Sequence, residues 1–185
     1  MYSTMKYLKF VLVWTLLGSW TIAVGQSKDQ ASPDAGLASF GWLVDLTGGC
    51  WRAEFSNGQT RDRQCFRQEF GRVLREDQTV TSLKEGRVTE VMEATSVYAW
   101  DGRKQKIRHV FWSSNGGFES STGWREGDAV IFYLDRETDS SGEANARTVL
   151  RKTGVDGYSA SREQRKGDKW APLFSIAYQR EAPGK

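Results

Sequence analysis

Residues 50–65 read CWRAEFSNGQTRDRQC and hold the only two cysteines of the 185-residue chain. Asn57 and Gly58 lie at the centre of this stretch, and Asn-Gly is a strong signal for a two-residue turn between antiparallel strands. Residues at equal distances from such a turn face each other, so Cys50 lies opposite Cys65. The stretch therefore predicts a β-hairpin with its two cysteines directly across from each other.

The two faces of this hairpin differ because side chains alternate along a strand. Trp51, Ala53 and Phe55 share an apolar face, which we expect to point into the protein. The same pairing places Asp62 and Gln64 on the inner face of the second strand. Their polar groups predict an interior that is partly polar. The candidate ligand-binding residues of the hairpin are Trp51, Phe55, Asp62 and Gln64.

The N-terminus has the pattern of a cleaved secretory signal over residues 1–25. Lys6 and Lys9 precede a nearly uninterrupted apolar run, and small residues lead to an expected cleavage between Gly25 and Gln26. The run is shorter than the roughly 20 residues that cross a membrane as a helix. An uncleaved anchor is the alternative. We expect a periplasmic or secreted protein without a membrane span once the signal is removed.

Removal of the signal also changes the charge balance. Lys6 and Lys9 are the only charged residues in the signal, so the 26 basic residues of the full chain fall to 24, against 23 acidic ones. The formal charge falls from +3 to about +1. This balance does not support a nucleic acid or an anionic membrane as a partner.

The two cysteines are predicted to form a structural disulfide. They lie on the outer face, and paired cysteines bond in an oxidising compartment. Counting from the turn makes them a hydrogen-bonded pair with Cα atoms about 5.5 Å apart. The Cys-x-x-Cys spacing of thiol oxidoreductases is absent. Arg52 faces Arg63 in this register, which is unfavourable, and a bulge that shifts the register is the alternative.

After Gly49, runs rich in Val, Ile, Thr and aromatic residues alternate with turns that contain Gly. This pattern predicts an all-β, antiparallel up-and-down barrel of about ten strands, with a β-sandwich as the alternative. Residues 26–36 predict a flexible leader, and residues 37–46 predict one short helix. Strands are expected near 50–56, 59–69, 72–81, 87–100, 104–113, 117–124, 129–136, 146–153, 158–165 and 171–180.

A short helix that leads into Gly49-Cys50-Trp51 resembles the start of calycin barrels, which include lipocalins, fatty-acid-binding proteins and nitrobindin-like proteins. Residues 97–133 also look like bacterial secreted proteins with a lipocalin-like domain of unassigned function. The resemblance covers residues 37–181 and leaves 182–185 as a tail. It implies that Trp51 plugs the closed end of the barrel with Arg180 of the last strand packed across it.

His109 is the only histidine and shares a strand face with Ile107 and Phe111. The resemblance to nitrobindin-like barrels implies haem as an alternative cofactor at His109, although no surrounding motif matches. A general base and a residue of the barrel wall are the other interpretations. We expect no metal site, because metal-ligand spacings are absent. Hydrolase, phosphate-loop and dinucleotide motifs are absent as well.

The resulting hypothesis is an exported barrel that binds a small apolar or amphipathic molecule in its interior, with His109 as a further cavity candidate. One alternative is an enzyme that uses Asp62 or His109 as its single acid or base. Another is an envelope protein that binds other proteins and has a packed interior. The sequence assigns no catalytic residue and no resident cofactor.

Overall fold

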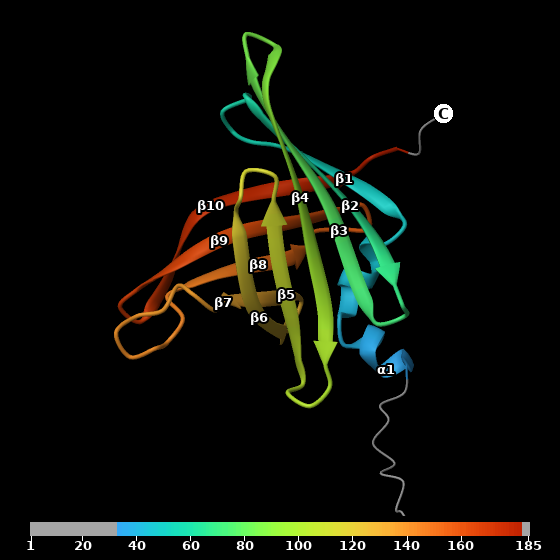
Figure 1. Cartoon of the computed structure of the whole chain (residues 1–185), viewed down its shortest axis with the longest axis vertical. Helices are drawn as coiled ribbons and strands as arrows, with labels where there is room; N and C mark the ends of the chain where they lie inside the picture. The colour runs from blue at the N-terminus through green and yellow to red at the C-terminus, as the bar shows by residue number, and fades with distance from the viewer. Residues whose placement is uncertain (1–32, 183–185) are drawn as a thin grey trace, which may run out of the picture. The chain divides into compact units, whose positions relative to one another are not determined.

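Ten antiparallel strands close into a barrel in the computed structural model, which describes residues 33–182 (Figure 1). Each strand pairs with its neighbours in sequence, and β1 closes the barrel against β10. The predicted ten-stranded barrel is confirmed, and the sandwich alternative is wrong. The strands are β1 (Gly49–Glu54), β2 (Thr60–Glu69), β3 (Val73–Lys84), β4 (Arg87–Asp101), β5 (Lys106–Ser113), β6 (Phe118–Glu126), β7 (Ala129–Leu134), β8 (Ala146–Lys152), β9 (Gly157–Lys166) and β10 (Lys169–Arg180).

Two short helical pieces precede the barrel, in place of the single helix predicted over residues 37–46. They are α1 (Pro33–Ala38) and the 3₁₀ helix η1 (Gly41–Leu46). η1 begins at Gly41, whose φ of +58° is a left-handed conformation that glycine adopts without strain. The helical region thus begins inside the segment that was predicted to be leader.

Several predicted segments fall on residues whose structure is not described. The signal peptide over 1–25, its cleavage site between Gly25 and Gln26, and the leader up to residue 32 lie outside the described residues, as do residues 183–185 of the tail. Within residues 33–182, no helix is both long enough and apolar enough to cross a membrane.

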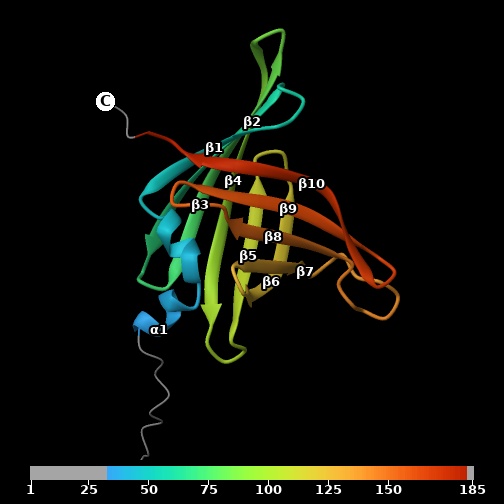
Figure 2. The ribbon, with the colours of Figure 1, turned by 180° about the vertical axis from the view of Figure 1, so that it is seen from behind.

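The helical pieces lie at one end of the barrel, where α1 is found beside the turn between β2 and β3 (Figures 1 and 2). Phe40, Leu43 and Leu46 are buried there in the same cluster as side chains from the strands. Trp42 Nε1 donates a hydrogen bond to the carbonyl oxygen of Asp128, between β6 and β7, at 3.0 Å. This end of the barrel is therefore closed by packed side chains.

Trp51 lies at the closed end and is 1% exposed. Its Nε1 donates to the Leu46 carbonyl oxygen at 3.3 Å, and the Arg180 guanidinium lies 4.4 Å from its ring centre. Arg180 Nη2 donates to the Asp45 carbonyl oxygen at 2.8 Å. A Cβ atom at Gly49 would lie 2.4 Å from Arg180 Nη1, so glycine leaves room for the guanidinium. The expected contact between Trp51 and Arg180 is present.

β1 and β2 pair in the predicted register, without a bulge, and the Cys50–Cys65 disulfide is present. Arg52 and Arg63 face each other as predicted, but Glu181 lies between them. Glu181 Oε1 accepts from Arg52 Nη2 at 2.9 Å, and Oε2 accepts from Arg63 Nε at 2.9 Å. One carboxylate thus bridges the two like charges, which is why the register holds and the bulge alternative is wrong.

The turn differs from the two-residue turn predicted at Asn57-Gly58. The favoured Asn-Gly turn needs a positive φ at both residues, and of these two only Gly58 has one, +64°. The amide of Phe55 donates to the Thr60 carbonyl oxygen, so the loop holds residues 56–59. Hydrogen-bonded and non-hydrogen-bonded pairs alternate along the hairpin, and this loop makes 55/60 a hydrogen-bonded pair where the two-residue turn would have made 56/59 one. The cysteines therefore form a non-hydrogen-bonded pair, with a Cα separation of 4.0 Å instead of the expected 5.5 Å or so.

Candidate functional site

The barrel interior contains a cavity of about 460 Å³. A cavity of this size with an apolar lining and a few polar groups is typical of sites for small organic molecules. Apolar side chains come from most of the strands around it. They include Phe55, Phe66, Val80, Met92, Phe111, Leu150, Phe174 and Ile176.

Polar side chains interrupt this lining along β2 and β3. The two strands pair Gln64 with Gln78. Because side chains alternate, residues two positions away face the same way, so Asp62 and Glu76 also point inward. All four side chains line the cavity. Two adjacent strands thus bring two carboxylates and two amides to one patch of the wall.

Asp62 is 3% exposed and receives three donors, all of which reach the same oxygen. Asp62 Oδ2 accepts from Tyr178 Oη at 2.6 Å, from Gln78 Nε2 at 2.7 Å and from Gln64 Nε2 at 3.4 Å. The other oxygen, Oδ1, is buried and has no hydrogen-bond partner within the described residues. Burial raises the pKa of Asp62, and the three hydrogen bonds oppose this rise only in part.

Glu76 is the second buried carboxylate and is 4% exposed. Tyr98 Oη donates to Glu76 Oε2 at 2.6 Å. Burial raises the pKa of Glu76 to about 7; the Tyr98 hydrogen bond opposes the rise, and the negative charges of Asp62 and Asp77 add to it. The Glu76 carboxyl group therefore gains or loses its proton near neutral pH.

Neither carboxylate has a cationic partner in the described part of the chain. Across residues 33–182, no nitrogen of a Lys, Arg or His side chain lies within 4.0 Å of a carboxylate oxygen of Asp62 or Glu76. This is unusual, because buried carboxylates are ordinarily paired with a positive charge.

Two tyrosines complete the cluster from β9 and β10. The rings of Tyr158 and Tyr178 stack with their centroids 4.6 Å apart and their planes 5° from parallel. Tyr158 Oη donates to Gln64 Oε1, and Gln64 Nε2 donates to Tyr178 Oη at 2.9 Å. Burial raises the pKa of both phenols well above their usual range, so they remain neutral donors. The cluster thus supplies hydroxyl and amide donors but no positive charge.

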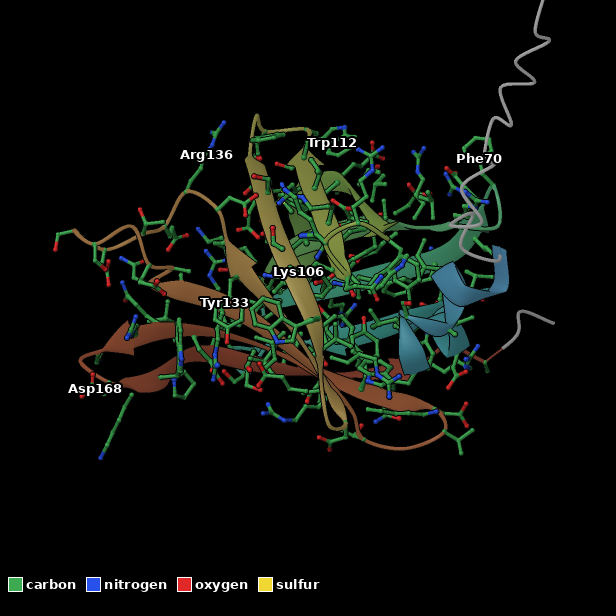
Figure 3. All side chains as sticks on the ribbon, turned by 90° about the horizontal axis from the view of Figure 1, so that it is seen from below. Phe70, Lys106, Trp112, Tyr133, Arg136 and Asp168 are labelled. Carbon is green, nitrogen blue, oxygen red and sulfur yellow. A yellow bond between two sulfur atoms is a disulfide. The ribbon has the colours of Figure 1, made fainter. Side chains whose placement is uncertain are left out.

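His109 faces the same cavity from β5, whereas Trp112 of that strand is exposed on the outside (Figure 3). The His109 ring stacks on Tyr98 at 4.6 Å and lies 5.4 Å from Phe132, and Nδ1 is 2.8 Å from Ser121 Oγ. Burial lowers the pKa of His109 to about 4, with a small opposing effect of the Asp135 charge. The imidazole is therefore neutral at physiological pH.

Another part of the cavity wall carries an arginine that is already paired. Arg162 Nη1 donates to Glu119 Oε2 at 2.8 Å, and Nη2 bonds to Glu137. Arg162 and Glu119 both line the cavity. Positive charge at this position is balanced by the protein itself.

The cavity residues do not fit haem. The His109 ring is packed against Tyr98 and Phe132. Haem also brings two propionate groups, whereas the cavity presents unpaired carboxylates, and its one lining arginine within the described chain is already held by glutamates. Among residues 33–182, no group of three or more His, Cys, Asp or Glu side chains has an arrangement that could hold a metal ion.

The structure brings four of the five predicted residues to one cavity. Phe55, Asp62, Gln64 and His109 line it, whereas Trp51 lies at the closed end under Arg180. The predicted site did not include Glu76, Gln78 or the hydroxyl groups of Tyr98, Tyr158 and Tyr178. A usable signal was the alternation of Leu74, Glu76, Gln78 and Val80, with Gly71 at a left-handed turn just before it.

Comparisons with known proteins support the fold alone. No family model matches the chain, and no curated protein matches it. The crystal structure of Rv2717c from M. tuberculosis is similar, with a TM-score of 0.51 and 16% sequence identity. The match covers 76% of this chain and 95% of the other.

Proposed function

We propose that this protein binds a small amphipathic molecule inside its barrel. The observation that carries the proposal is the cavity of about 460 Å³, whose lining combines apolar side chains with one polar cluster. The apolar side chains suit the body of a ligand, and the cluster around Asp62 and Glu76 suits its polar group.

We also propose that the protein is exported and belongs among the calycin barrels. Gly49-Cys50-Trp51 after a short helix, together with Arg180 packed on Trp51, supports the calycin assignment. The Cys50–Cys65 disulfide supports a periplasmic or secreted location, because disulfides persist in oxidising compartments.

The cavity favours ligand binding over an interaction module with a packed interior. An enzyme is the second candidate, because burial raises the pKa of Asp62 beside space for a substrate, as in many acid–base sites. If a ligand copurifies, incubation with wild-type protein and with Asp62→Asn tests that candidate. Product formed only by the wild type supports catalysis, and an unchanged ligand counts against it.

Titration with diphenylhexatriene, a neutral apolar dye that fluoresces when bound, tests the binding site. Ala160 lines the cavity from β9, and Ala177 of β10 is exposed on the outside. Ala160→Trp fills the cavity and is expected to lower dye affinity by about tenfold or more, since a bulky ring occupies the ligand's space. Ala177→Trp is the matched control and should bind like the wild type. Equal binding by both variants would place the dye elsewhere and overturn the proposal.

Native mass spectrometry of protein purified from its own envelope provides an independent measurement. We expect a bound mass that disappears after denaturation and that is depleted in Ala160→Trp. Spectra without any bound mass, together with absent dye binding, would count against a carrier role.

A further inference from the structure

We propose that the ligand of this cavity carries a protonated primary or secondary amine, which donates a hydrogen bond to Asp62 Oδ1 and offsets part of the negative charge of Asp62 and Glu76. This inference rests on the proposed function, because it names the chemical class of the ligand that the cavity binds. It follows from an unmet hydrogen bond, an unmet charge and the apolar surroundings of both.

The unmet hydrogen bond is at Asp62 Oδ1. This oxygen is buried without a partner in the described part of the chain, although the other oxygen of the same carboxylate accepts three hydrogen bonds. Gln78 and Tyr178 already donate to Oδ2, and the Tyr158 hydroxyl donates to Gln64. A buried acceptor left alone is costly, and the lining of the cavity is where a ligand can supply the donor.

The unmet charge belongs to two carboxylates. Glu76 and Asp62 lie close enough that the charge of Asp62 raises the pKa of Glu76. Their donors in the described residues are neutral hydroxyl and amide groups. Arg162 is already paired with Glu119 and Glu137 and does not serve them. A cation on the ligand would balance a charge that the described residues leave unbalanced.

These two requirements narrow the choice of functional group on the ligand to a cation that carries an N–H. A ligand carboxylate is repelled by Asp62 and Glu76. An alcohol can donate to Asp62 Oδ1 but brings no charge. A quaternary ammonium brings charge but has no N–H to donate. A protonated primary or secondary amine meets both requirements, and a charge-assisted N–H···O hydrogen bond is the stronger kind.

The rest of the cavity requires an apolar body on the same molecule. Leu150, Ile176 and Phe66 line the wall around the polar cluster. Phe55 and Phe174 approach each other with ring centroids 6.3 Å apart and both line the cavity. An amine on a compact hydrocarbon or aromatic skeleton therefore matches the lining better than a small hydrophilic polyamine.

Four probes with the same eight-carbon chain test the inference: octylamine, octanol, octanoate and octyltrimethylammonium. Isothermal titration calorimetry at about pH 8 keeps octylamine protonated and favours ionised carboxylates. We expect octylamine to bind about tenfold or more tightly than octanol and octyltrimethylammonium, and octanoate to bind most weakly. Octanol or octyltrimethylammonium binding as tightly as octylamine would overturn the amine assignment.

Two variants locate the binding group. Asp62→Asn should lower octylamine affinity by about tenfold or more and change octanol affinity by less than about threefold. Glu76→Gln should lower octylamine affinity by about fivefold or more, so the test does not depend on one variant folding. Asp77→Asn removes a carboxylate from the outer face of the same strand and is the control, with unchanged octylamine affinity. Unchanged octylamine affinity in both inner variants would overturn the proposal.

Diphenylhexatriene separates failure of the amine assignment from failure of the proposed function. If the dye binds the wild type and is excluded by Ala160→Trp, but octylamine has no advantage over octanol, the interior site stands and the amine assignment falls. If neither the dye nor any of the four probes binds, both proposals fall.

Discussion

Glu76 and Asp77 are adjacent carboxylates on β3, and they face opposite sides of the barrel wall. Asp77, on the outside, forms ion pairs with Arg67 and Arg75. Partial burial would raise the pKa of Asp77, but the hydrogen bonds and charges of these arginines outweigh burial and lower it. Glu76, on the inside, has only the Tyr98 hydroxyl as a hydrogen-bond donor among the described residues, and burial raises its pKa to about 7.

The comparison shows that Asp77 on the outer wall is paired with cations, whereas the two inner carboxylates have no cationic partner among the described residues. Glu181 likewise holds Arg52 and Arg63 on the outside. Some cations on the outer face of the barrel also contact aromatic rings. Lys106 Nζ lies 4.6 Å from the ring centre of Trp124, which stacks on Tyr133 at 4.8 Å. Lys106 and Tyr133 are labelled in Figure 3. The two buried carboxylates without a cationic partner among the described residues, Asp62 and Glu76, both face the cavity, which is why we place the proposed function there.

The largest expected effect is a pH-dependent gain of stability in Glu76→Gln. Between pH 4.5 and about 7 the folded state keeps the Glu76 proton and the unfolded state loses it, so rising pH lowers the free energy of unfolding. A change of pKa from 4.5 to about 7 amounts to on the order of 3 kcal/mol. The glutamine variant lacks this loss and should gain that much relative to the wild type over the window.

Urea unfolding of both proteins across this window measures the difference. The wild type must be measured beside the variant because His109 affects both proteins in the opposite direction. Burial lowers the pKa of His109 to about 4, so the unfolded state gains the proton first as pH falls, and this lowers the free energy of unfolding. Asp62 and the phenols of Tyr98, Tyr158 and Tyr178 also surround Glu76 and are common to both proteins. A difference that stays constant with pH would show that Glu76 is not buried as described.

The next largest effect is expected from Tyr98→Phe. It removes the hydroxyl that donates to Glu76 at 2.6 Å and leaves a buried carboxylate without its donor. We expect a loss of about 2 kcal/mol of unfolding free energy at about pH 8, where Glu76 is mostly ionised, and a smaller loss at about pH 5. Tyr133→Phe on the outer wall is the control, with a change below about 0.5 kcal/mol. Equal losses in the two variants would remove the distinction between the faces.

The smallest effect is expected from Asp77→Asn. Its ion pairs are partly exposed, so their loss should cost less than about 1 kcal/mol and should shrink further in about 1 M salt. The contribution of a carboxylate with a lowered pKa is present above the pKa of the unfolded state and is lost as pH falls through the lower folded value. Chemical unfolding at low and high salt measures it. A cost as large as that of Tyr98→Phe would mean that the outer pairs are as important as the inner cluster.

Much of the architecture is readable from local sequence. Turn residues and β-branched runs predicted strand positions that differ from the observed ones by a few residues, and hairpin symmetry predicted the partner of Cys50. These features depend on neighbours in the chain. The turn at Asn57 was predicted less well, because its side chain accepts a hydrogen bond from the Gln59 amide at 2.8 Å and Asn57 does not take the left-handed conformation.

The candidate site was predictable only in part, for a physical reason. Alternation along one hairpin was enough to place Asp62 and Gln64 inside. Glu76 required the register between β2 and β3, and the tyrosine donors come from β4, β9 and β10, which are distant in sequence. Closure of the barrel between β1 and β10 is what brings Tyr178 to Asp62.

The sequence by itself determined the strands, the hairpin, the cysteine pair and the direction of each side chain, because alternation and turn chemistry act over a few residues. Only the tertiary structure decided which inward side chains meet, which charges find a partner and whether space remains among them. Those properties depend on the number of strands and on closure of the barrel. Closure sets the surroundings of Asp62, which lines the cavity and keeps one oxygen without a partner among the described residues.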